Sequence, residues 1–123
     1  MRFSDDEFGQ LVQQALESLP TKFRRKMENL AVEVQSRPTP AMARSLGCRS
    51  VRDLLGAYIG VPLTHKHVDT PWEFPEFIYI FQRNIEDICA TPQEVVEEVR
   101  RTVLHEIAHH FGWDDDALDE MGY

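Results

Sequence analysis

The chain has 123 residues, 42% of them apolar and 28% charged, a composition that is typical of a globular domain and excludes a disordered chain. We expect a single domain over residues 1–123, large enough to bury about two thirds of the surface of the unfolded chain. No apolar run approaches the roughly 20 residues that cross a bilayer, and a net charge of −8 argues against a nucleic acid as substrate or partner.

The N-terminal part predicts two helices. Ser4 followed by Glu7 is a capping-box pattern, which marks the start of a helix. Apolar residues then recur at helical spacing until Pro20, where the pattern ends. A second, shorter helix is expected over residues 21–29.

The chain begins without the apolar segment of a secretory signal, so we expect a cytoplasmic protein. Cys48 and Cys89 are its only cysteines. In a cytoplasmic protein these residues are expected to be two reduced thiols rather than a disulfide.

The middle of the chain predicts two strands. Residues 30–35 alternate between apolar and other residues at period two, which indicates a strand. Residues 41–53 are ambiguous and can contain a helical turn. Residues 54–60 predict the second strand, in which Gly56 and Gly60 suggest a bulge or a close backbone approach. The residues of the first strand expected to face the core are Leu30, Val32 and Val34.

A long irregular connection over residues 62–75 precedes the most apolar strand. His65 and His67 lie in this connection and can hold a second metal or contact a substrate, although two exposed loop histidines are the favoured interpretation. Residues 77–82 are apolar enough to be a strand covered on both faces. Residues 83–90 are expected to be a connection.

The last long helix is expected to begin at Thr91 as N-cap, with Pro92 at the first helical position and Glu94 completing a capping box. Its two faces differ in composition. The apolar face contains Val96, Val99, Val103, Leu104, Ile107 and Phe111. The other face contains Glu98, Thr102, His105, His109 and Gly112. Because His105 and His109 lie away from the core face, we expect them to bind a metal in a cleft rather than to be buried in the core.

Residues 105–115 read H-E-x-x-H-x-x-G-x-x-D. Side chains four apart lie on one face of a helix, so His105 and His109 can bind one ion. Zinc takes neutral imidazole nitrogens, and a catalytic zinc site typically has three protein ligands and one water. Glu106 lies about 100° around the helix from His105, where its carboxylate can act on that water as a general base.

A glycine at position 112 can end the helix, because glycine readily adopts the left-handed conformation. The chain can then turn back and bring Asp115 to the metal as the third ligand. Asp114 and Asp116 are alternatives, but only position 115 keeps the spacing of the motif. Iron, cobalt or manganese would fit two histidines and an aspartate as well as zinc.

This motif resembles that of the zincin metallopeptidases, and its extended form resembles that of the metzincins. The chain is similar over nearly its whole length to the minimal zincin family of small bacterial proteins. The similar segments are residues 11–20, 55–63, 103–112 and 118–123. The resemblance implies a compact zincin fold, Zn²⁺ on His105, His109 and Asp115, and Glu106 as the catalytic base.

We therefore expect an α+β, zincin-like fold in which a small mixed β-sheet packs against the long helix with the HExxH motif. Two N-terminal helices and a short C-terminal helix over residues 116–121 complete it. The active cleft is expected between the long helix and the last strand. By resemblance that strand can pair with extended substrate, although an interior strand is an equal alternative. His110 is assigned to the surface or to the surroundings of the metal, and Tyr123 to a C-terminal anchor or an oxyanion contact.

The predicted function is a zinc-dependent metallopeptidase that hydrolyses peptide bonds of a peptide or an unfolded protein segment. The alternative is a catalytically weak or inactive binding module that the metal stabilises. A metal-dependent ribonuclease is disfavoured by the negative charge of the chain.

Overall fold

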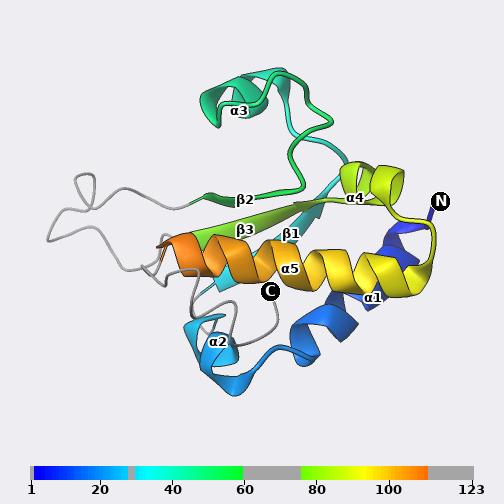
Figure 1. The fold of residues 1–123 in the computed structure, drawn as a ribbon, viewed down its shortest axis with the longest axis vertical. Coiled ribbons are helices and arrows are strands. Elements are labelled where there is room, and N and C mark those ends of the chain that lie inside the picture. Colours follow the sequence, from blue (N-terminus) through cyan, green and yellow to red (C-terminus); the bar gives the residue numbers. More distant parts are fainter. Residues whose placement is uncertain (1, 28–29, 60–75, 111–123) are drawn as a thin grey trace, which may run out of the picture.

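The computed structural model describes residues 2–27, 30–59 and 76–110 (Figure 1). In chain order the elements are α1 (Asp5–Glu17), α2 (Thr21–Lys26), β1 (Leu30–Gln35), α3 (Pro40–Ser45), β2 (Gly56–Ile59), β3 (Glu76–Phe81), α4 (Gln82–Ile88) and α5 (Pro92–His110). Several predictions fall outside the described residues: those on His65, His67, Phe111, Gly112, Asp115, the C-terminal helix and Tyr123.

The three described strands form one mixed sheet in the order β1-β3-β2. Strand β3 is parallel to β1 and antiparallel to β2. The strand predicted over residues 77–82 is therefore the interior strand, and its alternative assignment as the strand that pairs with substrate is wrong. Within the described part of the chain, the two edges of the sheet are β1 and β2.

The core lies between the sheet and the helices α1 and α5, which pack against each other over one face of the sheet (Figure 1). The described residues of the predicted apolar face of α5 are all buried, and Ile78 and Ile80 of β3 are completely buried below them. Burying a side chain of this size stabilises a fold by about 1.5–3 kcal/mol. The core residues of α5 are Val95, Val96, Val99, Val103, Leu104, Ile107 and Ala108.

Both long helices begin at the predicted residues, but only α1 forms the predicted capping box. The Ser4 hydroxyl accepts a hydrogen bond from the Glu7 amide, and the Glu7 carboxylate accepts one from the Ser4 amide, each at 3.1 Å. At the start of α5 the Thr91 hydroxyl accepts from the Glu94 amide at 3.1 Å. The Glu94 carboxylate accepts from the amide of Ala90, one residue earlier than a capping box requires.

Two local predictions are wrong. Val34 is 37% exposed, because it lies in the second half of β1, an edge among the described strands, whose last three residues are all exposed. Residues 83–88 of the predicted connection over residues 83–90 are instead part of helix α4 (Gln82–Ile88). Three of the four buried side chains of α4 are polar, so the segment lacks the apolar periodicity that indicates a helix. They are Gln82, Asn84 and Glu86.

These polar side chains connect α4 to segments that are distant in sequence. The buried Glu86 carboxylate accepts hydrogen bonds from Gln82, Arg83, the backbone amide of Phe3 and Arg2. Burial alone would raise the pKa of Glu86, but these hydrogen bonds outweigh it and hold the pKa below its usual value.

Asn84 of α4 fixes the chain that leads into β2. Its amide nitrogen donates to the carbonyl oxygens of Val51 and Leu54 at 2.7 and 2.6 Å. Its amide oxygen accepts from Arg37 at 2.6 Å. Asn84 is completely buried, so this contact is part of the core that positions β2.

Cys48 and Cys89 are free thiols, as predicted. Burial, with smaller contributions from Glu98 and Glu94, raises the pKa of Cys89 to about 11, so this thiol stays protonated at neutral pH. Among the described helices, none is both long and apolar enough to cross a membrane.

Candidate active site

His105, Glu106 and His109 lie in the last two turns of α5. The rings of His105 and His109 are 6.4 Å apart between centroids and inclined at 67°. His105 is half-buried and His109 is exposed. The two imidazoles therefore lie next to each other one helical turn apart, as predicted. Imidazole nitrogens are common ligands of zinc.

The Glu106 side chain extends from α5 to the edge of the sheet. Its Oε2 atom accepts a hydrogen bond from the backbone amide of Tyr58 in β2 at 3.2 Å. Burial raises the pKa of Glu106 above its usual value, although the Tyr58 amide and the neighbouring His109 both lower it. A carboxyl group with a raised pKa in a half-buried site is suited to take up and release a proton.

The phenol of Tyr58 interacts with a different carboxylate. Burial and a hydrogen bond to Glu76 raise the pKa of Tyr58, so the phenol stays protonated at neutral pH. Tyr58 is half-buried and packs against the core. The backbone and the side chain of this residue thus contact two different carboxylates.

Helix α5 lies very close to β2 at Gly56. A Cβ atom at this position would lie 2.5 Å from Cγ2 of Thr102 and 2.9 Å from the carbonyl oxygen of Tyr79. Only glycine fits there, which confirms the close backbone approach predicted from the sequence.

Helix α5 and strand β2 run side by side in the same direction (Figure 1). The contact of Gly56 with Thr102 and the hydrogen bond of Tyr58 with Glu106 are therefore two successive contacts between them. Thr102 and Glu106 are four residues apart on the helix, a rise of about 6.0 Å. Gly56 and Tyr58 are two residues apart on the strand, a rise of about 6.8 Å. Because these two rises are nearly equal, the Glu106 carboxylate lies at the Tyr58 amide.

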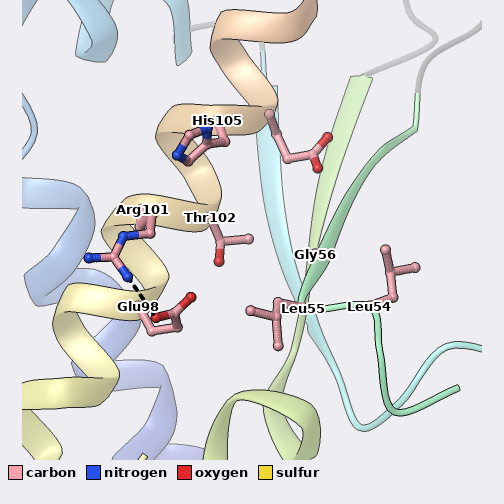
Figure 2. A pocket seen from close by; sticks show the side chains of 8 residues that line it. Leu54, Leu55, Gly56, Glu98, Arg101, Thr102 and His105 are labelled. Atoms are coloured by element: carbon pink, nitrogen blue, oxygen red, sulfur yellow. Dashed lines mark hydrogen bonds and ion pairs between the residues drawn. The ribbon is translucent and has the colours of Figure 1, made fainter. Parts of the chain in front are cut away.

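A pocket of about 250 Å³ lies between α5 and the start of β2. Figure 2 shows Leu54, Leu55 and Gly56 on the strand side of the pocket, with the Leu55 side chain directed toward α5. The residues on the helix side are Glu98, Arg101, Thr102, His105 and Glu106. A cavity of about 150 Å³ holds benzene, so this pocket has room for one amino-acid side chain.

This pocket differs from the predicted cleft in its position. The cleft was expected beside the last strand, but β2 and the residues before it form the wall of the pocket. The reason is the strand order, since β3 lies inside the sheet and β2 forms the edge beside α5. Arg101 and Glu98 form an ion pair at 3.4 Å within the lining.

The predicted metal ligands are described only in part. His105 and His109 are brought together, whereas Asp115 and its neighbours Asp114 and Asp116 lie outside the described residues. Within the described ranges no group of three or more His, Cys, Asp and Glu side chains could hold a metal ion. The third ligand therefore stays a prediction.

Sequence reasoning missed the part that Tyr58 plays in the site. Its contribution is a backbone amide, which every residue except proline has, so no residue type in the sequence marks it. The available signal was Gly56, which indicated a close approach to this strand two residues earlier.

A model of a family described as zincin-like metallopeptidases matches residues 27–123 of the chain. Among solved structures, a conserved hypothetical protein from Thermus thermophilus is similar, with a TM-score of 0.58 and 22% sequence identity. The similarity covers 89% of this chain and 94% of that protein. At this identity the likeness shows the fold alone. No curated protein matches the chain. The expected zincin-like α+β fold is thus confirmed.

Proposed function

Because the chain belongs to the zincin-like metallopeptidase family, we propose that it hydrolyses peptide bonds with the help of a bound zinc ion and Glu106 as general base. One observation carries the proposal. Glu106 is half-buried in the wall of a pocket, one position from His105 and three from His109, whose rings adjoin each other. A proton acceptor, two side chains that can bind a metal and a pocket for a substrate are thus close together.

The donor set fits zinc as far as the described residues show it. We propose that His105, His109 and Asp115 hold the ion. When bound, zinc polarises the carbonyl of the scissile bond and makes a water molecule more acidic.

The other steps belong to residues of the chain. Glu106 removes a proton from the attacking water and passes it to the leaving nitrogen of the cleaved bond. The pocket beside Glu106 accepts one substrate side chain, which would contact the side chains of Leu54, Leu55 and Thr102 in its wall. Among the described strands, β2 is an edge strand beside the pocket, an arrangement that suits an extended peptide or an unfolded protein segment.

The test compares two Glu→Gln substitutions on the same helix. Glu106→Gln should reduce cleavage of an unfolded protein by at least about 100-fold, because a general base typically contributes 10²–10⁴ to the rate. Zinc content, measured by elemental analysis, should remain that of the unchanged protein. Glu97→Gln is the control, since Glu97 is exposed and lies outside the pocket. Equal cleavage by the unchanged protein and Glu106→Gln would contradict the mechanism.

A second measurement separates this proposal from the binding-module alternative. Thermal unfolding is recorded with one equivalent of zinc and with chelator, alongside the cleavage assay. A large loss of stability on chelation together with no cleavage by the zinc-loaded protein would favour a module that the metal only stabilises.

A further inference from the structure

The amide that contacts Glu106 belongs to an outward-facing position of an edge strand. In an antiparallel pair, each residue directs its N–H and C=O groups to the same side. The Leu55 carbonyl accepts from the Phe81 amide at 3.0 Å, so Leu55 and every second residue after it face β3. Tyr58 lies in the other set and faces away from β3, where its amide meets Glu106.

We propose that the Tyr58 backbone amide positions the general base, and this proposal rests on the proposed function. A carboxylate has two oxygen atoms, and the amide binds Oε2 of Glu106 at 3.2 Å. The Oε1 atom is the one that we assign to the attacking water. A carboxylate that is held by one oxygen keeps the other in a fixed place beside the pocket, which is what proton transfer requires.

Two other contacts fix the strand that carries this amide. Asn84 binds the Leu54 carbonyl at 2.6 Å, just before the strand begins. Gly56 lies against Thr102, which is one helical turn before Glu106. This contact sets the distance between β2 and α5 close to Glu106. The strand that carries the Tyr58 amide is thus held just before its first residue, by Asn84, and at Gly56, by the contact with α5.

The competing explanation is purely structural. A carboxylate on an outward amide also satisfies a strand edge that would otherwise attract another chain. The two explanations make different predictions for kcat, because capping an edge affects stability and aggregation but not the rate of proton transfer.

Hydrogen exchange tests the contact without any need for catalysis. We would measure exchange of the Tyr58 amide by NMR in the unchanged protein, in Glu106→Ala and in Glu106→Gln. Alanine removes the acceptor, so exchange should become at least about tenfold faster. Glutamine keeps a carbonyl oxygen at the same place, so exchange should change by less than about threefold. Equal protection in the unchanged protein and Glu106→Ala would overturn the proposal.

Proline at position 58 tests the catalytic role, because it removes the N–H group of an outward-facing edge position and breaks no hydrogen bond to β3. Tyr58→Ala is the matched variant, since it loses the same phenol but keeps the amide. With a peptide substrate, Tyr58→Pro should lower kcat by roughly 10- to 100-fold and leave KM within about threefold. Tyr58→Ala should show a much smaller loss of kcat.

Equal losses of kcat in Tyr58→Pro and Tyr58→Ala would overturn the positioning role, because the amide would then be irrelevant. A loss that appears only in KM would do the same. If the unchanged protein cleaves no peptide while the exchange difference is present, the proposed function fails, and the amide contact is only a cap on the strand edge.

Discussion

Replacing Gly56 with alanine tests the geometry on which the site depends. The new Cβ atom would lie 2.5 Å from Cγ2 of Thr102 and 2.9 Å from the Tyr79 carbonyl oxygen. Both distances are too short, and the second involves backbone that cannot rotate away. Overpacking of this kind costs about 1–3 kcal/mol. The stiffer unfolded chain offsets roughly 0.4–1 kcal/mol. The middle values of the two ranges leave a net loss of about 1 kcal/mol.

The measurement is urea unfolding of Gly56→Ala, with Gly9→Ala as the matched control. A Cβ atom at Gly9 would meet nothing within 4 Å on the exposed side of α1, so this variant should be more stable by about 0.5–1 kcal/mol. Thr102→Ser removes Cγ2, so combining it with Gly56→Ala should recover part of the loss. Recovery should be incomplete, because the contact with the Tyr79 carbonyl remains. An unchanged stability of Gly56→Ala, or no recovery in the double variant, would refute the close approach of α5 and β2.

Two further predictions concern the polar interior of α4. Glu86→Gln should lower the free energy of unfolding at pH 7 by about 1.5–3 kcal/mol, because the buried carboxylate loses charge-assisted hydrogen bonds. The pKa of Glu86 is lower in the folded state than in the unfolded state, so its stabilisation is present at neutral pH and is lost as pH falls through the folded pKa. Urea unfolding from pH 7 to pH 3 should therefore show a flatter acid dependence in Glu86→Gln, and equal slopes would contradict this assignment. Asn84→Ala should cost about 2–4 kcal/mol, because the carbonyls of Val51 and Leu54 lose their donor. Faster amide exchange around β2 should accompany this loss, and an unchanged exchange pattern would show that Asn84 does not hold the strand.

The sequence predicted those parts of the fold in which burial and helix caps leave a pattern of residue types. The core face of α5 follows from its apolar spacing, and the starts of α1 and α5 follow from Ser4 and Thr91. The parts that it missed are stabilised by polar groups inside the protein. Helix α4 buries Asn84 and Glu86, which pattern reasoning assigns to the surface.

The candidate site was predictable to a similar extent. The adjacency of His105 and His109 follows from helical spacing alone. The wall of the pocket does not, because the strand beside α5 depends on the order of the strands in the sheet. An apolar run such as β3 fits an interior or an edge position equally well. Asp115 as third ligand lies outside the described residues and stays a prediction.

The side-by-side course of α5 and β2 limits how large a site of this kind can be. From one contact to the next, four residues advance about 6.0 Å along the helix and two residues advance about 6.8 Å along the strand. The two elements therefore drift apart by about 0.8 Å per step, and after a few steps a side chain no longer reaches its partner. Glu106 lies a single step from the fixed point at Gly56, where this drift is smallest. Lengthening either element would add no further usable positions, so new specificity in such a small domain has to come from the loops around it.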